Sequence, residues 1–324
     1  MIFPLNVYLL ALAGGLVASA GSLPLWRAWC RRIGHVDDPG HRKIHSEPVA
    51  LAGGLAVFTG LALPVLMATA VVALGWLDPA TQRAVAHGLA RRGPQLAAVL
   101  GGCLGMVVLG WLDDRYELRA ATKFGGQVLI ALLVAASGVR ITLFVPSAAF
   151  SIAVTVLWIV TLTNAFNFLD NMNGLCAGVG AIGAFAFGMK AAIGGQYLVA
   201  ILAFLAFGAL LGFLPYNYPR ATAFLGDAGS HLVGFLLAVL AILPHFYSTD
   251  HPVRLAVLNP LLILAVPLVD LVWVVVIRWR LGKPFYVGDN NHLSHRLVRR
   301  GLSRTRAVLV IWLLAAGAAA LAFA

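Results

Sequence analysis

Ten long apolar stretches divide the 324-residue chain, and they restrict its fold more than any other feature. A helix that crosses a bilayer needs about 20 mostly apolar residues. The chain is 61% hydrophobic and only 11% charged, which leaves too little polar surface for a soluble domain. We therefore predict an all-α, polytopic integral membrane protein with about ten transmembrane helices. Without an internal repeat or a low-complexity linker, residues 1–324 are expected to form one domain.

The stretches occupy residues 3–26, 51–76, 95–111, 124–136, 150–166, 175–189, 197–214, 231–246, 258–276 and 307–323. The first is too long for a signal-peptide core and is interpreted as a retained span. The fourth and sixth are short. The fourth is expected to continue past Gly138 and Arg140 toward Phe144, and the sixth to begin within residues 168–174.

The charged residues are unevenly distributed between the two sides of this topology. The loops after odd-numbered spans hold 17 of the 23 lysines and arginines, and positive charge favours the cytoplasm. These loops are therefore predicted to be cytoplasmic, with both termini outside. Nine of the 12 carboxylates also lie in or beside the odd loops. The rule that orients membrane proteins by positive charge does not explain this grouping of acidic residues. Together with the net charge of +11, this indicates a site for anionic substrates at lipid headgroups, and argues against nucleic acid as a partner.

The first two cytoplasmic loops carry charge patterns suited to phosphate chemistry. Arg42 and Lys43 follow an Asp-Pro-Gly turn, and they are either headgroup anchors or phosphate ligands. Asp113 and Asp114 are adjacent at a helix end, where two carboxylates repel each other. They are either solvated charges or part of a divalent-cation site, and Lys123 could neutralise a phosphate or the pair itself if the loop folds back.

The remaining cytoplasmic loops add polar residues at membrane depth. Asn164, Asn167 and Asp170 are three residues apart, which places them on one helix face for either function or helix packing. Asp227 lies in a Gly-Asp-Ala-Gly-Ser segment before a span, where it is either a metal ligand or, like Ser230, an N-cap.

The fifth loop contains two histidines and an arginine. His292 and His295 share a face if this segment is helical, and Arg296 is their neighbour. Two histidines alone are weak evidence for zinc. The three cysteines match no metal-ligand spacing and are expected to be packing residues.

Five segments in order resemble the cytoplasmic motifs of the polyprenyl-phosphate N-acetylhexosamine-1-phosphate transferases, bacterial relatives of phospho-N-acetylmuramoyl-pentapeptide transferase. The resemblance covers about residues 34–302 and favours the undecaprenyl-phosphate N-acetylglucosamine-1-phosphate branch. The segments are DDPGHRKIH, GWLDDRYELRAATKFGGQ, TNAFNFLDNMNGL, FLGDAGS and HLSHRL.

The resemblance implies an enzyme of the inner membrane with its active site on the cytoplasmic face. It implies transfer of a sugar-1-phosphate from a UDP-sugar to undecaprenyl phosphate, which releases UMP, requires Mg2+ and initiates a cell-envelope polysaccharide. A homodimer is compatible with it.

The resemblance also implies roles for individual residues. It assigns catalysis to Asp113, Asp114, Asp170 and Lys123, and metal binding to Asp227 and Asp170. It assigns substrate binding to Arg42, Lys43, Asn164, Asn167, Asn173, His292, His295 and Arg296.

Two positions depart from the family pattern. Asn173 stands where the family usually has a second aspartate near the nucleobase pocket, and Ser294 replaces the middle histidine of the fifth motif. Three alternatives stay open at this point. They are a muramoyl-pentapeptide transferase, an inactive lipid-binding homologue, and a lipid or solute transporter, which Asp270 within the ninth span would suit. If the protein is an enzyme, Asp270 is expected to cap or orient the ninth helix near the site.

Overall fold

The computed structural model describes residues 3–39, 47–142, 145–244, 257–284 and 290–324. These residues form helices and one short hairpin. The helices are α1 (Leu5–Arg32), α2 (Gly53–Ala73), α3 (Pro79–Tyr116), α4 (Ala120–Ala136), α5 (Ala148–Leu169), α6 (Leu175–Ile193), α7 (Tyr197–Asn217), α8 (Gly226–Ile242), α9 (Asn259–Ile263), α10 (Ala265–Arg280), α11 (Leu293–Arg299) and α12 (Arg304–Leu321). The strands are β1 (Val36–Asp37) and β2 (Val49–Ala50).

Each of the ten apolar stretches contains a helix, which confirms the all-α, polytopic fold. Within the described ranges, seven helices are long and apolar enough to cross a membrane, and α4 and α8 are shorter apolar helices. The ninth stretch is broken at Leu264 between α9 and α10. Pro267 explains the break, because it lacks the N–H that would continue the helix from α9. The count of ten spans and the outside position of both termini stay predictions.

Two expected helix boundaries were wrong. α4 ends at Ala136 and does not continue toward Phe144, because Gly138 has a φ of +97°, a left-handed conformation that ends a helix. α6 begins at Leu175 and not earlier, because Gly174 has a φ of +76°.

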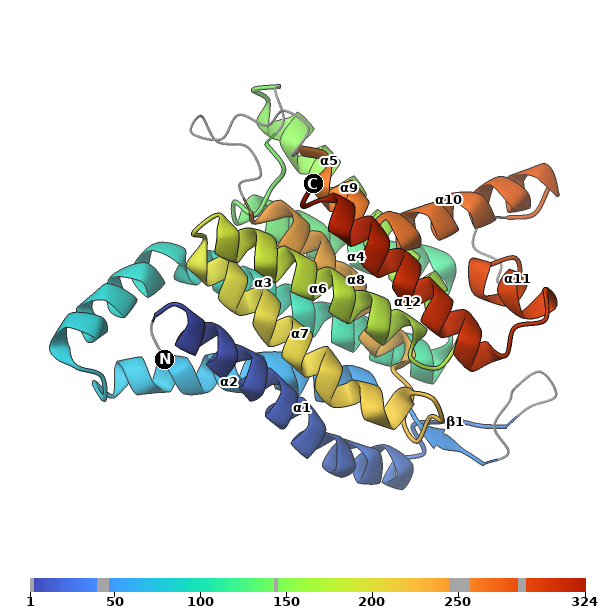
Figure 1. Ribbon diagram of the computed structural model, residues 1–324, viewed down its shortest axis with the longest axis horizontal. Helices are drawn as coiled ribbons and strands as arrows, with labels where there is room; N and C mark the ends of the chain where they lie inside the picture. The colour runs from blue at the N-terminus through green and yellow to red at the C-terminus, as the bar shows by residue number, and fades with distance from the viewer. Residues whose placement is uncertain (1–2, 40–46, 143–144, 245–256, 285–289) are drawn as a thin grey trace.

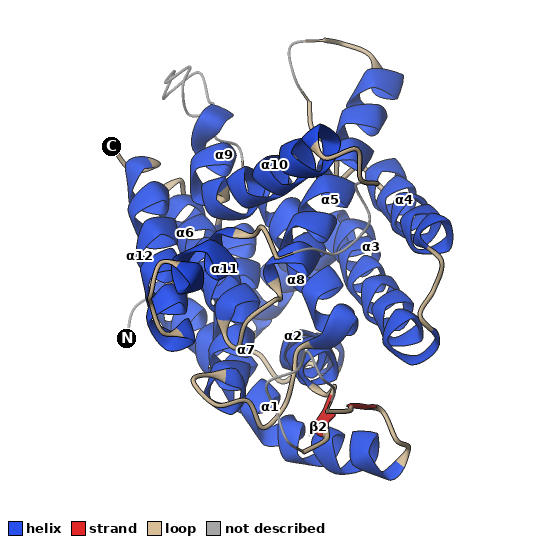
Figure 2. Ribbon diagram, turned by 90° about the vertical axis from the view of Figure 1, so that its right-hand side faces the viewer, coloured by secondary structure: helices blue, strands red, loops and turns tan. Residues whose placement is uncertain are grey.

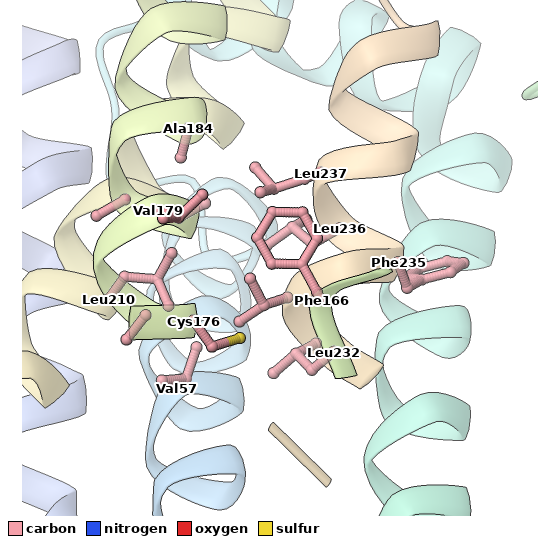
Figure 3. Close-up of a cluster of buried hydrophobic side chains, with 14 of the residues drawn as sticks. Val57, Phe166, Cys176, Val179, Ala184, Leu210, Leu232, Phe235, Leu236 and Leu237 are labelled. Carbon is pink, nitrogen blue, oxygen red and sulfur yellow. The ribbon is translucent and has the colours of Figure 1, made fainter. Parts of the chain in front are cut away.

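Helix α8 lies at the centre of the bundle. Figure 2 shows it surrounded by neighbouring helices, and it packs against α2, α3, α5 and α6. Its residues 228–241 are all buried, as expected for a helix that is apolar on every side. Phe166, Cys176 and Leu210 pack with Leu232 and Leu236 along the middle of α8 (Figure 3). This core gives the start of α8 a rigid support.

Two glycines let the backbones of α2 and α3 come into direct contact with the backbone of the first turn of α8. A Cβ atom on Gly54 would lie 2.5 Å from the backbone nitrogen of Gly229. A Cβ atom on Gly110 would lie 2.4 Å from the backbone nitrogen of Ala228. Neither position can hold a larger residue without moving α8, so both helices fix the segment that carries Asp227.

The β1–β2 hairpin joins the loop after α1 to the loop before α8. The strands are antiparallel, and Ala50 forms a bridge with Ala223. The N–H of Phe224 donates to the carbonyl oxygen of Ala50 at 2.9 Å, and the N–H of Gly53 donates to the carbonyl oxygen of Phe224 at 2.9 Å. β1 and α11 lie at the same end of the molecule (Figure 1). Arg42 and Lys43 belong to residues 40–46, which lie outside the described residues.

Candidate active site

The ammonium group of Lys123 is the centre of a polar cluster formed by three other helices. Its Nζ lies 2.5 Å from Oδ2 of Asp113 at the end of α3, and 2.6 Å from Oδ2 of Asp227 in the first turn of α8. It also donates to Oδ1 of Asn167 near the end of α5, at 3.3 Å. The α3–α4 loop therefore does fold back, so that Lys123 neutralises carboxylates from two helices.

Asn167 connects α5 to the start of α8. Its Nδ2 donates to Oδ1 of Asp227 at 2.8 Å and to the hydroxyl oxygen of Ser230 at 3.0 Å. Since Oδ2 of Asp227 pairs with Lys123, both oxygens of this carboxylate have a defined partner. A carboxylate that is part-buried and has both oxygens held is preorganised, and it has no freedom to turn away from an incoming cation.

Asp114 points away from Asp113, so the adjacent aspartates do not act as one pair. Its Oδ1 accepts the backbone N–H of Asp227 at 2.9 Å, and its Oδ2 accepts the N–H of Ala228 at 3.2 Å. The cap of α8 is therefore a carboxylate from α3, in place of the Asp227 or Ser230 cap considered from the sequence. A negative charge is stabilised here by the N-terminal end of the helix dipole.

Asp170 follows the last residue of α5 and adds a fourth carboxyl group. Burial, together with the charges of Asp227 and Asp114, raises the pKa of this carboxyl to about 8. Lys123 pairs directly with only two of these four carboxyl groups, those of Asp113 and Asp227. Two carboxylates around one ammonium leave a net negative charge, which favours binding of a divalent cation.

His231 completes the cluster, and it was not predicted as a site residue because it is the first residue of the apolar stretch 231–246. It lies one turn after Asp227 and is fully buried. Ligand atoms of Asp113, Asp227 and His231 lie within 4.8 Å of one another, and Nδ1 of His231 has no hydrogen-bond partner among the described residues. An ionisable residue four positions after an aspartate in an apolar helix was the available signal.

Gln127 contacts the imidazole ring of His231 through its side-chain amide. Its Nε2 lies 3.5 Å from Nε2 of His231, and its Oε1 accepts the Nδ2 hydrogen of Asn164 at 2.6 Å. Gln127 and His231 are both fully buried. The predicted site residue Asn164 therefore has an indirect role: it orients Gln127, which contacts the imidazole of His231.

The donor set can hold a divalent metal ion. Carboxylate oxygens are the ligands that Mg2+ and Ca2+ prefer, and an imidazole nitrogen extends the set toward first-row transition metals. Asp113, Asp227 and His231 are close enough to share one ion, and a neutral imidazole offers a lone pair on whichever ring nitrogen carries no proton. Each of these ligands comes from an element that is held by hydrogen bonds or backbone packing, which favours a fixed coordination geometry.

The predicted histidine motif forms α11, and Asp270 holds its start. Oδ2 of Asp270 lies 2.7 Å from Nδ1 of His292, and its Oδ1 accepts the N–H of Leu293 at 2.7 Å. The expectation that Asp270 caps or orients the ninth helix was wrong. It lies within α10 and caps α11. The His292 ring lies 6.0 Å from the ring of Phe168, which connects α11 to the end of α5.

The other residues of α11 are also held in place. The guanidinium of Arg296 lies over the Trp273 ring, 4.4 Å from its centroid. The hydroxyl of Ser294 donates to Oδ1 of Asn171 at 2.6 Å. Ser294, one of the two departures from the family pattern, therefore joins the fifth motif to the third. His295 is half-buried, with its ring 6.3 Å from that of His292.

Asn173 lies apart from the Lys123 cluster. Its Nδ2 donates to the carbonyl oxygen of Pro219 at 3.3 Å. It lines a cavity of about 320 Å³ together with Tyr218, Arg220 and Arg304. The structure therefore gathers Asp113, Asp114, Lys123, Asn164, Asn167, Asp170 and Asp227 around one centre. It places His295 and Arg296 on α11 and His292 directly before it, and it leaves Asn173 at a separate cavity.

Comparison with known proteins assigns the family. A model described as glycosyl transferase family 4 matches residues 96–245, which include Asp113, Lys123, Asn167 and Asp227. A probable undecaprenyl-phosphate N-acetylglucosaminyl 1-phosphate transferase of Bacillus subtilis is 33% identical over 299 residues, covering 90% of this chain and 77% of the relative. The chain belongs to this family.

Two further relatives of glycosyl transferase family 4 carry similar names. The decaprenyl-phosphate N-acetylglucosaminephosphotransferase of Mycobacterium tuberculosis strain H37Rv is 34% identical over 315 residues, covering 89% of this chain and 74% of the relative. The undecaprenyl-phosphate alpha-N-acetylglucosaminyl 1-phosphate transferase of Escherichia coli K12 is 27% identical over 307 residues, covering 90% and 76%. The similarity therefore extends well beyond the matched segment.

Proposed function

We propose that this family 4 protein transfers N-acetylglucosamine-1-phosphate, or a closely related sugar-1-phosphate, from a UDP-sugar to undecaprenyl phosphate. The products are undecaprenyl-diphospho-sugar and UMP, and the reaction would begin a cell-envelope polysaccharide. The names of the relatives support the lipid acceptor and the sugar phosphate. The single observation that carries the proposal is the Lys123 cluster, where carboxylates from α3 and α8 share one ammonium.

The chemistry requires two anionic groups to meet. An oxygen of the lipid phosphate attacks the phosphorus that carries the sugar, and a new P–O–P linkage forms. The bond from that phosphorus to the oxygen bridging to the uridine phosphate breaks, and this oxygen leaves with UMP. A phosphate monoester has its second pKa at about 6, so most of the lipid phosphate needs no base at neutral pH. Positioning and electrostatics therefore supply most of the rate enhancement.

The candidate metal site fits Mg2+. Asp227 and Asp170 would hold the ion, with Asp113 and His231 close enough to contribute. When bound, Mg2+ screens the repulsion between the two phosphate groups and neutralises charge on the departing UMP. Because Oδ1 and Oδ2 of Asp114 both accept backbone N–H groups, we assign Asp114 to positioning Asp227, and not to nucleophilic attack.

The remaining polar residues would bind the two phosphates. Lys123 is within reach of both the carboxylates and an incoming phosphate, and its charge opposes the negative charge that develops. His292, at the N-cap of α11, and His295 and Arg296 within it would contact the diphosphate, with His292 oriented by Asp270. Arg42 and Lys43 would bind phosphate from the first loop, and Asn173 would contact the nucleoside.

The distribution of charge supports a cytoplasmic position for the site. The loops that we assign to the cytoplasm hold 17 of the 23 basic residues. The site lies at the end of α3 and the start of α8, which belongs to that side of the proposed topology. UDP-sugars are cytoplasmic metabolites, so a cytoplasmic site in the inner membrane would have direct access to both substrates.

The test measures UMP release by the purified protein in lipid nanodiscs. The protein is supplied with Mg2+, undecaprenyl phosphate and, in separate reactions, UDP-GlcNAc, UDP-GalNAc or UDP-N-acetylmuramoyl-pentapeptide. We expect UMP and the matching lipid-linked sugar phosphate with an N-acetylhexosamine donor. If no donor releases UMP, the proposed reaction is wrong.

Two variants make the test specific to the site. Asp227→Asn removes the charge of the carboxylate that pairs with Lys123, and it should abolish the reaction. Glu117→Gln is the matched control, because Glu117 is an exposed carboxylate only three residues after Asp114. It should retain the wild-type rate, and a comparable loss in both variants would show that the site has been assigned to the wrong residues.

A further inference from the structure

A second cavity lies at the other end of the same helices that build the site. It is lined by the start of the apolar part of α3, the segment after α4, the start of α7 and the end of α8. The site occupies the opposite ends of α3, α4 and α8. The cavity has a volume of about 340 Å³, equivalent to roughly ten water molecules at ~30 Å³ each.

The mouth of this cavity is cationic. Arg92 and Arg140 both line it and are both exposed, and none of the lining residues that the structure describes is acidic. Nη1 of Arg92 donates to Oε1 of Gln95 at 3.0 Å, which fixes the direction of that arginine. Gly138, with its left-handed φ of +97°, allows the chain after α4 to pass close to Gln95 and leads directly to Arg140.

The floor of the cavity is apolar. Leu96, Val99, Leu202 and Leu243 line it, and the same four residues also line an adjoining, wholly apolar void between α2, α3, α7 and α8. Tyr197 stands at the rim, at the first residue of α7. Tyrosine is enriched where a helix crosses from hydrocarbon to headgroups. The cavity therefore passes from a cationic rim to an apolar interior at the depth of the membrane interface.

We propose that this cavity binds an anionic phospholipid of the bilayer on the face opposite the active site. Arg92 and Arg140 would hold the phosphate, because a guanidinium presents paired donors to phosphate oxygens. The acyl chain would cover Leu96, Val99 and Leu202. A free phosphate would contact only the arginines at the rim. A zwitterionic lipid would also place its positive headgroup beside those two arginines. An anionic lipid therefore matches both the rim and the apolar floor of the cavity.

The test measures lipid binding to delipidated protein by native mass spectrometry. The protein is titrated with phosphatidylglycerol, phosphatidylcholine, undecaprenyl phosphate and inorganic phosphate in parallel. We expect one phosphatidylglycerol to bind at least tenfold more tightly than phosphatidylcholine. Inorganic phosphate should bind far more weakly, because it gains nothing from the apolar floor. No UDP-sugar is present, so the result is independent of the proposed reaction.

Matched variants locate the site. R92Q/R140Q removes two charges from the rim and should weaken phosphatidylglycerol binding at least tenfold. R83Q/R91Q removes two exposed arginines from the same helix outside the cavity, and it should bind as the wild type does. Leu202→Trp fills the floor and should weaken lipid binding while leaving phosphate binding unchanged.

Three outcomes would overturn the proposal. They are equal binding of phosphatidylcholine and phosphatidylglycerol, equal loss in the two double variants, and tighter binding of undecaprenyl phosphate than of phosphatidylglycerol at the same arginines. The last outcome would assign the cavity to the lipid substrate. The second readout is the unfolding temperature. Phosphatidylglycerol should raise it in R83Q/R91Q and should leave it unchanged in R92Q/R140Q.

Discussion

Replacing Asp114 with asparagine tests whether this carboxylate works through α8. Its two oxygens accept the N–H groups of Asp227 at 2.9 Å and Ala228 at 3.2 Å. Asparagine offers one acceptor oxygen, and its amide nitrogen would face the second N–H as another donor. The substitution therefore leaves one half-buried backbone N–H without an acceptor and removes the charge from the other bond.

The magnitude follows from these two bonds. A hydrogen bond to a charged group contributes about 1.5–3 kcal/mol, a neutral one about 1 kcal/mol, and an unsatisfied buried donor costs about 1–3 kcal/mol. Loss of one bond and weakening of the other should therefore lower the free energy of unfolding by roughly 2–4 kcal/mol. The first turn of α8 would also loosen, and Asp227 would leave its place beside Lys123, so UMP release should fall together with stability.

The assay is thermal unfolding in detergent, followed by the intrinsic fluorescence of the eight tryptophans. Asp113→Asn is the matched variant, because its remaining Oδ1 can still accept the N–H of Leu118 and Lys123 keeps its pair with Asp227. It should cost less than Asp114→Asn does, because it removes the charge from one contact with Lys123, whose ammonium keeps a second carboxylate partner. If Asp114→Asn unfolds at the wild-type temperature, or Asp113→Asn is the less stable of the two, the positioning role of Asp114 is refuted.

Three further substitutions test the cluster and α11. His231→Leu should weaken Mn2+ binding by about tenfold in titration calorimetry. It should also remove the nitrogen coupling from the pulsed EPR spectrum of bound Mn2+, and an unchanged spectrum would exclude His231 as a ligand. Asp270→Asn should lower kcat/KM for the UDP-sugar about tenfold in a UMP-release assay, since a charged hydrogen bond to His292 contributes at least about 1.5 kcal/mol. Lys123→Met should tighten Mn2+ binding in calorimetry, because the ammonium no longer competes with the metal ion for two carboxylates. UMP release should fall by at least about 100-fold. Weaker Mn2+ binding in this variant would contradict the competition between lysine and metal.

Hydropathy predicts the helices well, because a bilayer forces a spanning chain to satisfy its backbone hydrogen bonds locally. It does not predict where a helix breaks inside an apolar stretch. The separation of α9 from α10 depends on Pro267, and the end of α4 depends on the conformation of Gly138. It also gives no signal for α11, a seven-residue helix of mixed polarity that is held by Asp270 from another element.

The site residues were largely predictable, and their partners were not. Motif residues such as Asp113 and Asp227 are visible because carboxylates are costly at membrane depth. Which carboxylate contacts Lys123 depends on the turn after α3, where Glu117 has a φ of +47° and reverses the chain. The cap that Asp114 provides joins residues 113 positions apart, and only the packing of α3 on α8 decides it.

The balance of charge around Lys123 explains why such a site needs more than one cation. One ammonium already neutralises parts of two carboxylates, at 2.5 and 2.6 Å, and burial with the nearby carboxylates raises the pKa of Asp170 to about 8, because a further negative charge is unfavourable there. A phosphate entering the site must share that same ammonium, and it would meet net repulsion. Because opposite charges in a partly desolvated site attract strongly, additional positive charge is required before two phosphates can approach each other. The carboxylates that hold a metal ion and the lysine that contacts phosphate are therefore parts of one electrostatic unit, and α8 is buried on every side because it must keep that unit fixed.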